Sequence, residues 1–157
     1  MPRRKVLFLC IGNSCRSQMA EGFARTYGSD VMAAQSAGIG PASSVSPLTI
    51  AAMKEKNIDM SESVPKGLDA VDRAGLNIIV NISGRNMPVP GVTVVDWNVR
   101  DPIGLDEKVF REVRDEIERL VMNLILRFRI EDRELADSSA PAESSPSKVD
   151  TQRGRFR

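Results

Sequence analysis

The chain alternates short apolar runs with longer stretches in which apolar residues recur every three or four positions. Short runs of this kind are typical of buried strands, and the longer stretches are typical of amphipathic helices. We therefore expect strands at about residues 5–9, 31–36, 76–82 and 92–97. Helices are expected at about residues 17–27, 46–57 and 106–128, with a further short helix within residues 65–73.

The alternation of strands and helices predicts an α/β fold of three layers, a four-stranded parallel sheet with helices on both faces. Right-handed crossovers in such a fold place a functional site at the carboxyl ends of the strands. The last helix has the clearest apolar stripe, formed by Phe110, Val113, Ile117, Leu120, Val121, Leu124 and Phe128. The methionine and aromatic positions on the helices are therefore assigned to the core rather than to a cofactor site.

Length and composition indicate one compact domain followed by a tail. The chain has 157 residues, which is enough for a single hydrophobic core without disulfides or metal. We expect this catalytic domain at residues 1–133. Residues 134–157 are rich in serine and proline and end in a basic segment, so we predict a disordered tail there. A basic terminus could contact an acidic partner, but the pattern favours a solvated tail.

Charge and cysteine content exclude several classes of function. The formal net charge of +1 gives no case for nucleic acid or a membrane surface as a partner. The apolar stretch after the basic N-terminal residues is too short for a signal peptide, and no segment approaches a transmembrane span. The two cysteines lie close together in one loop rather than in a disulfide framework. We therefore expect a protein of the reducing cytoplasm.

Histidine is absent from the chain. This excludes Ser-His-Asp and Cys-His catalytic machinery and makes a conventional zinc site improbable, so neither a metal nor another cofactor is expected. Any reactive thiolate must be stabilised by its own loop. Any proton donor must be a carboxylate, a tyrosine, a lysine or water.

Cys10 ends the first apolar run and begins a loop that an amphipathic helix follows at once. Gly12 lets the backbone approach a ligand closely, and Asn13 tolerates a left-handed conformation better than most residues. Consecutive amides in such a turn can form an anion-binding concavity, and the helix start adds its positive end. These surroundings favour a thiolate, so we expect Cys10 to be a nucleophile.

The residues around Cys10 complete an oxyanion site. The Arg16 guanidinium can bind two oxygens of a phosphate or arsenate at once, and we assign Cys10 and Arg16 as catalytic. The Ser17 hydroxyl could hydrogen-bond the sulfur and ease its departure as a leaving group. The loop residues assigned to substrate binding are Ile11, Gly12, Asn13, Ser14, Cys15 and Ser17. The competing interpretation, an ordinary buried cysteine, fits the isolated residue but not the whole pattern of strand, loop, arginine and helix.

Cys15 has two interpretations. Its thiol could form a reversible disulfide with Cys10 and shield the nucleophile from overoxidation. Alternatively, it could be a small side chain packed under the loop. Neither interpretation makes Cys15 catalytic.

The segment from Cys10 to Gly22, CIGNSCRSQMAEG, resembles the signature of the low-molecular-weight protein tyrosine phosphatase superfamily, which includes thioredoxin-coupled arsenate reductases. The resemblance spans about residues 4–130 and continues at Ser36-Ala37-Gly38, at residues 57–61, at Asp96-Trp97 and at Asp101-Pro102. It implies a Rossmann-like phosphatase fold, a cysteine nucleophile, a phosphate-binding loop and a general-acid aspartate from a later loop, with no metal.

Asp101 is the candidate proton donor. It lies just after the fourth expected strand, and the resemblance carries the Asp-Pro pair of the family onto Asp101-Pro102. We assign Asp101 as the third catalytic residue. Two alternatives remain: Asp101 could merely cap the last helix, or Asp96 could be the acid, although its place in a strand beside Trp97 suggests a structural role.

Two departures from the resemblance bear on the substrate. Thioredoxin-coupled arsenate reductases carry a further pair of cysteines after the third strand, whereas residues 80–89 here contain none. Tyrosine phosphatases of this kind tend to carry tyrosines after the Asp-Pro pair, where this chain has Ile103-Gly104. The missing cysteines weigh more because they perform chemistry.

We therefore expect a phosphatase that hydrolyses phosphate monoesters, protein phosphotyrosine or aryl phosphates, through a cysteinyl-phosphate intermediate. The alternative is an arsenate reductase that uses Cys10 with an external thiol. A second alternative is a non-catalytic, oxyanion-binding regulatory protein. The corresponding partners are a phosphorylated protein or a small oxyanion, with thioredoxin or a low-molecular-weight thiol in the reductase case.

Overall fold

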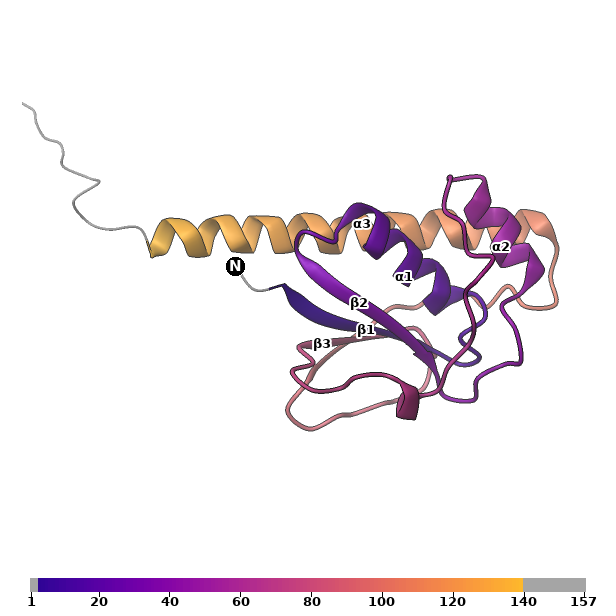
Figure 1. Cartoon of the computed structure of the whole chain (residues 1–157), viewed down its shortest axis with the longest axis horizontal. Coiled ribbons are helices and arrows are strands. Elements are labelled where there is room, and N and C mark those ends of the chain that lie inside the picture. The colour runs from indigo at the N-terminus through magenta and orange to yellow at the C-terminus, as the bar shows by residue number, and fades with distance from the viewer. Residues whose placement is uncertain (1–2, 140–157) are drawn as a thin grey trace, which may run out of the picture. The chain divides into compact units, whose positions relative to one another are not determined.

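The computed structural model describes residues 3–139 of the chain. The elements are β1 (Arg4–Cys10), α1 (Arg16–Tyr27), β2 (Met32–Gly38), α2 (Pro47–Lys54), the 3₁₀ helix η1 (Leu68–Ala70), β3 (Ile78–Asn81), β4 (Thr93–Asp96) and α3 (Glu107–Ser138). Figure 1 labels β1 to β3 and the three α-helices. All expected strands and helices are present, with ends that shift by a few residues at most positions.

The four strands form one parallel sheet in the order β2-β1-β3-β4. β1 lies in the middle, and its residues 6–10 are buried because both faces of the sheet are covered. The register pairs Cys10 with Gly38 of β2 and Leu9 with Asn81 of β3. The carboxyl ends of these strands therefore meet beside the loop that follows Cys10. The predicted four-stranded parallel α/β fold is confirmed.

Different elements cover the two faces of the sheet. α1 packs on β1 and β2, and α2 lies next to α1 on the same side (Figure 1). On the opposite face, Leu7 and Leu9 belong to a cluster completed by Ala37, Val71 and Ile79. The helical cover on this face is the short η1 helix, and irregular segments supply the rest of the packing.

Two helix ends differ from the sequence-based expectation. α2 ends at Lys54, and Asn57 then adopts a left-handed conformation with φ 61° that turns the chain away. α3 continues ten residues beyond the expected end at Phe128, to Ser138. Its last turns are rich in residues that favour helices, so the helix persists where the regular apolar stripe has ended.

The chain divides into two compact units, residues 1–125 and 126–157. Within the first unit, α3 buries Phe110, Val113, Ile117, Val121 and Ile125. In the second unit α3 continues to Ser138, so residues 134–138 of the expected tail are helical. Ser139 follows as a turn, residues 140–157 of that tail lie outside the described residues, and the domain boundary at 133 stays a prediction.

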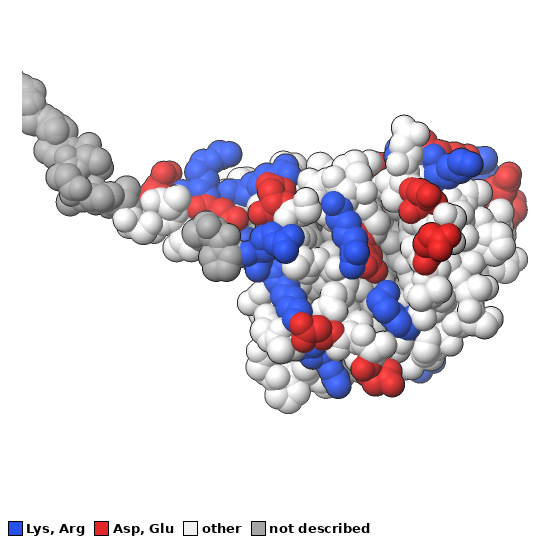
Figure 2. All heavy atoms as spheres, viewed as in Figure 1, with Lys and Arg blue, Asp and Glu red and all other residues white. Residues whose placement is uncertain are grey.

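None of the helices within residues 3–139 combines the length and the apolar character needed to cross a membrane. On the face shown in Figure 2, Lys and Arg side chains are interspersed with Asp and Glu, and neither sign forms a continuous patch. This face therefore offers no broad positive surface to an anion.

Candidate active site

The loop between β1 and α1 is held with its carbonyl groups turned outward. The carbonyl oxygens of Cys10, Ile11, Gly12 and Ser14 accept hydrogen bonds of 2.9–3.1 Å from the amides of Ile39, Gly40, Ala42 and Ser46. Because a trans peptide points its C=O and the following N–H in opposite directions, the amides of this loop turn inward. The amides of residues 12–15 donate to no acceptor within residues 3–139. Free amides in such a loop are suited to binding a tetrahedral oxyanion.

Two positions give the loop its conformation. Asn13 has a φ of 52°, in the left-handed region that its sequence pattern predicted. Gly38, at the end of β2, lies directly against the loop: a Cβ there would come within 2.7 Å of the Ile11 oxygen and 2.8 Å of the Asn13 nitrogen. Only a glycine lets β2 approach the loop this closely.

Cys10 lies at the base of this loop. Its side chain is almost fully buried, and its Sγ is 2.7 Å from Ser17 Oγ at the start of α1. A pocket of about 210 Å³ opens above it, lined by Cys10, Ile11, Gly12, Ser14, Cys15, Arg16, Ala42, Asp101 and Ile103. The pocket thus collects seven of the nine predicted site residues, while Asn13 and Ser17 lie fully buried beneath the loop.

Arg16 is held at the pocket by two backbone carbonyls from distant segments of the chain. Its Nη1 donates to the Ile82 oxygen at 2.8 Å and to the Val99 oxygen at 3.0 Å. These carbonyls follow β3 and β4, so the sheet topology itself fixes the guanidinium. The second terminal nitrogen, Nη2, faces Asp101 Oδ2 at 3.6 Å. Sequence patterns gave no sign of the two carbonyls, because a backbone acceptor leaves no mark on residue type.

Asp101 reaches the pocket from the loop after β4, and its side chain is 50% exposed. Its Oδ1 accepts a hydrogen bond of 3.1 Å from the Ile103 amide. Asp101 does not cap the last helix: α3 begins at Glu107, and its first turn is capped by Asp106, whose Oδ1 accepts from the Val109 amide at 3.2 Å.

Asp96 lies in a different environment. Its Oδ1 accepts from Asn81 Nδ2 at 2.9 Å, and the two residues line a separate pocket with Trp97. The Trp97 ring packs against Phe8 with 5.9 Å between the ring centroids. Asp96 therefore stabilises the end of the edge strand β4, and it does not line the pocket that contains Cys10.

A buried hydrogen-bond chain supports the loop from below. Asn13 Nδ2 donates to Ser17 Oγ at 2.7 Å and to Ser36 Oγ at 3.0 Å. Ser36 in turn donates to Glu21 Oε1 at 2.5 Å, and Lys66 Nζ lies 3.6 Å from the same carboxylate oxygen. Ser36 belongs to the Ser-Ala-Gly motif noted in the sequence, whereas Glu21 and Lys66 were not singled out as site residues, because only the folded chain brings them together.

Cys15 is a buried free cysteine of the loop that also contacts α1. Its Sγ lies 4.0 Å from Met19 Sδ, and its thiol is hydrogen-bonded to Thr49. Burial raises the pKa of the Cys15 thiol from 9.0 to about 12, and this effect outweighs the opposing influence of Thr49 and Arg16. The thiol therefore stays protonated at neutral pH, where a protonated sulfur is a poor nucleophile.

Comparison with known proteins gives a consistent result. A model of the family described as low molecular weight phosphotyrosine protein phosphatase matches residues 5–136. The chain is 37% identical over 129 residues to the glutaredoxin arsenate reductase of Synechocystis, covering 79% of this chain and 98% of that protein. It is 41% identical over 122 residues to arsenate reductase 1 of Bacillus cereus, covering 73% of this chain and 89% of that protein.

A solved structure described as an arsenate reductase in the phosphate binding state has the same fold. It superimposes with a TM-score of 0.72 at 35% sequence identity, covering 80% of this chain and 98% of that chain.

The expectation of a phosphatase for phosphotyrosine or aryl phosphates is therefore wrong, because these relatives are named arsenate reductases and favour the alternative. The missing pair of cysteines excludes an internal relay, but it does not exclude reduction by an external thiol. The pocket is also unlike an aryl-binding cleft: none of the described residues that line it is aromatic.

Proposed function

Because the chain belongs to the low molecular weight phosphotyrosine protein phosphatase family, we propose that it is an arsenate reductase in which Cys10 binds arsenic covalently and an external thiol supplies the electrons. The observation that carries this proposal is the meeting of Cys10, Arg16, Asp101 and the inward-facing loop amides in one small pocket. The similarity to arsenate reductases supports the choice of oxyanion.

In the first step, the loop amides and Arg16 hold the oxygens of arsenate while the Cys10 thiolate attacks arsenic. A sulfur–arsenic bond forms and an arsenic–oxygen bond breaks. Asp101 donates the proton that lets the departing oxygen leave as water. Arsenic remains As(V) at this stage, and Ser17 is placed to stabilise the sulfur by its hydrogen bond.

In the second step, an external thiolate attacks the Cys10 sulfur. A sulfur–sulfur bond forms, and the electron pair of the sulfur–arsenic bond passes to arsenic, which leaves as arsenite, As(III). A second thiol then attacks the mixed disulfide and releases Cys10. The sum is one arsenate and two thiols converted into one arsenite, one disulfide and one water. This chemistry requires no metal or organic cofactor on the protein.

The electrons must come from outside the chain. Cys10 and Cys15 are its only cysteines, and Cys15 is buried, bonded to Thr49 and protonated at neutral pH. Two classes of reductant remain: a low-molecular-weight thiol, or a small dithiol protein of the thioredoxin or glutaredoxin kind. The printed name of the Synechocystis relative, a glutaredoxin arsenate reductase, supports the second class for a similar protein.

The proposal is tested by measuring arsenite produced from arsenate by the full chain. Parallel reactions contain glutathione with glutaredoxin, or thioredoxin with its reductase, and arsenite is quantified by chromatography coupled to elemental mass spectrometry. We expect arsenite with at least one reductant and none with Cys10→Ser. Hydrolysis of p-nitrophenyl phosphate is measured on the same preparation. Turnover of that ester without arsenite in either thiol system would overturn the proposal.

A further inference from the structure

We propose that the pocket beside Trp97 binds the thiol that reduces arsenic, and that this thiol carries an amino-acid head group separated from its sulfur by a spacer, as glutathione does. The inference rests on the proposed function and deepens it, because it names the class of external thiol and the place where it binds. It gives a task to Arg85 and Asp96, which the reaction steps above do not use.

The pocket beside Trp97 has a volume of about 340 Å³ and lies where β3 and β4 end. Volumes of about 300–1,000 Å³ are usual for small-molecule sites. The lining includes one cation, Arg85, one anion, Asp96, and the side-chain amides of Asn86 and Asn98. A zwitterionic head group, with one ammonium and one carboxylate, therefore meets a partner for each of its charges in this pocket.

A buried amide holds the two charged residues in place. Asn81 is only 2% exposed, and its Nδ2 donates to the Arg85 carbonyl oxygen at 2.6 Å and to Asp96 Oδ1 at 2.9 Å. Its Oδ1 accepts from the Ser83 amide at 3.1 Å and from the Ser83 hydroxyl at 2.6 Å. Asn81 thus ties the turn that carries Arg85 to the end of β4, so the site is organised before a ligand arrives.

The polar ends of these side chains are unpaired within residues 3–139. The Arg85 guanidinium, the amides of Asn86 and Asn98, and Asp96 Oδ2 make no hydrogen bond or ion pair with protein groups there. A guanidinium can bind a carboxylate through two parallel hydrogen bonds. The second oxygen of Asp96 is available to accept from an ammonium group.

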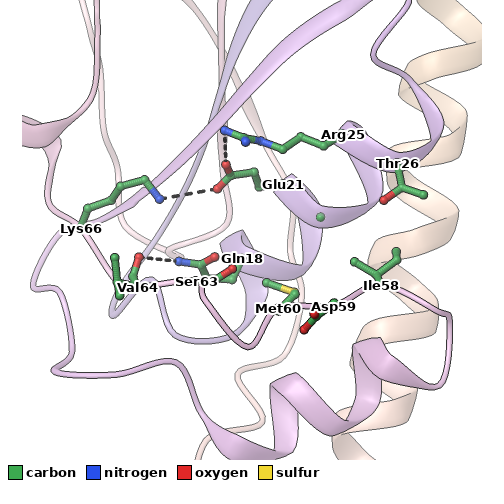
Figure 3. A pocket seen from close by; sticks show the side chains of 11 residues that line it. Gln18, Glu21, Arg25, Thr26, Ile58, Asp59, Met60, Ser63, Val64 and Lys66 are labelled. Atoms are coloured by element: carbon green, nitrogen blue, oxygen red, sulfur yellow. Dashed lines mark hydrogen bonds and ion pairs between the residues drawn. The ribbon is translucent and has the colours of Figure 1, made fainter.

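A pocket of about 420 Å³ beside α1 is the competing site (Figure 3). Its charges already pair with one another. Lys66 Nζ lies 3.6 Å from Glu21 Oε1, and Arg25 Nη2 lies 2.6 Å from Glu21 Oε2. Figure 3 shows Lys66 and Arg25 reaching Glu21 from opposite directions. A zwitterion would have to displace these partners, so the pocket beside Trp97 suits it better.

The pocket beside Trp97 lies at the same end of the sheet as Cys10. Leu9, Asn81 and Asp96 pair in register on three neighbouring strands, so Cys10 and Trp97 occupy the next positions on β1 and after β4. Neighbouring strands are about 4.8 Å apart, which separates these two backbones by about 10 Å. The path from the head-group carbon of a γ-glutamylcysteine unit to its sulfur is about 9 Å when extended. A thiol of this length, bound beside Trp97, can reach Cys10.

The bound thiol performs the second step of the proposed reaction. It loses its proton to water, and the thiolate attacks the Cys10 sulfur. A sulfur–sulfur bond forms, and the electron pair of the sulfur–arsenic bond passes to arsenic, which leaves as As(III). A second thiol then releases Cys10 from the mixed disulfide. Arg85 and Asp96 take no part in these bond changes, so they act as positioning residues.

Trp97 is the one tryptophan of the chain, so its fluorescence reports on this pocket. S-methylglutathione carries the amino-acid head group but cannot form a disulfide, and it therefore probes binding alone. We expect a saturable change with a dissociation constant in the millimolar range, because charge pairs in an open pocket are weak. Absence of a saturable change in the wild type would overturn the proposal.

Two variants test the charges while they keep the Asn81 contacts. Arg85→Met retains the backbone carbonyl that Asn81 binds, and Asp96→Asn retains the accepting oxygen. Each should weaken binding of S-methylglutathione by roughly fivefold to tenfold. Arg73→Met removes an exposed arginine from another loop and should bind as the wild type does. Equal dissociation constants for the wild type and Arg85→Met would overturn the proposal.

Steady-state reduction shows whether the bound thiol is the one that reacts. In Arg85→Met the KM for glutathione in arsenite formation should rise by the same factor, while the rate at saturating glutathione changes by less than about twofold. With dithiothreitol, which has no charged group, the wild type and Arg85→Met should be alike. An unchanged KM for glutathione, or arsenite formed with thioredoxin but not with glutathione, would overturn the assignment of this pocket to the reducing thiol.

The fluorescence titration needs neither arsenate nor a reaction at Cys10. Binding without arsenite formation by any reductant would keep the binding site and remove the proposed function. Arsenite formation without binding would remove the site alone.

Discussion

The carboxylate of Asp101 lies 3.6 Å from the guanidinium of Arg16, on the wall of the pocket that contains Cys10. The two side chains differ sharply in exposure: Arg16 is 7% exposed and Asp101 is 50% exposed. Arg16 is fixed by two backbone carbonyls, whereas Asp101 can exchange protons with solvent. In the proposed mechanism an incoming oxyanion competes with Asp101 for Arg16, so we expect the carboxylate both to supply a proton and to oppose binding.

Replacing Asp101 by Asn should therefore separate binding from chemistry. We expect the single-turnover rate of arsenite formation to fall by roughly 10²–10⁴, the usual contribution of a general acid. Arsenate should bind as well as before or better, because a competing negative charge is gone. Rapid-quench measurements over a range of arsenate concentrations give both quantities. Weaker binding with an unchanged rate would show that Asp101 is not the proton donor.

Gly38→Ala should damage the oxyanion loop. The added Cβ would lie 2.7 Å from the Ile11 oxygen and 2.9 Å from the Gly12 carbonyl carbon, distances at which backbone must move. We expect a loss of about 1–3 kcal/mol in the free energy of unfolding and a large loss of arsenate reduction. Gly40→Ala is the matched control, because nothing lies within 4 Å of a Cβ there. Urea unfolding of the two variants makes the comparison, and similar effects in both would contradict the close approach of β2 to the loop.

Cys15→Ala should retain turnover with an external thiol to within about tenfold, while Cys10→Ser should have none. Only the backbone amide of Cys15 belongs to the oxyanion site, and its buried thiol stays protonated at neutral pH. Steady-state arsenite production checks this prediction. Complete loss of turnover in Cys15→Ala, with the fold intact, would mean that the Cys15 sulfur takes part in the reaction.

The buried Cys15 thiol should also make stability depend on alkaline pH. Burial raises its pKa from 9.0 to about 12 in the folded chain, so the folded state favours the protonated form. This contribution is complete below about pH 9 and is lost progressively as the pH rises from 9 toward 12. The stability advantage of the wild type over Cys15→Ala should therefore shrink across this range. Denaturant unfolding at several pH values measures it, and a constant difference would be inconsistent with the raised pKa.

The first strand, the loop and the first helix could be predicted from sequence because their signals are local. The apolar run before Cys10, the glycine and asparagine after it and the helical spacing from Ser17 all lie within about 25 consecutive residues. Even the hydrogen bond between Ser17 and Cys10, which the sequence only suggested, is present at 2.7 Å.

Contacts made by the folded chain were harder to foresee. Lys66 meets Asn13 across 53 positions of sequence, and the carbonyl that orients Arg16 at Val99 lies 83 positions away. No periodicity or spacing links such residues, and one of each pair contributes only backbone. The substrate predicted from sequence was wrong for a different reason. The absence of a second cysteine pair excludes electron transfer through cysteines of that pair, but it does not exclude reduction by an external thiol.

In the proposed mechanism an external thiol attacks the Cys10 sulfur and releases arsenite, which leaves a mixed disulfide on Cys10. Trapping this mixed disulfide tests the mechanism most directly. The full chain is mixed with arsenate and glutathione, quenched with acid within seconds and analysed by intact and peptide mass spectrometry. We predict one glutathione on the peptide that contains Cys10, attached to that sulfur and formed only when arsenate is present. Glutathione that appears equally without arsenate, or that is attached to Cys15, would contradict the account.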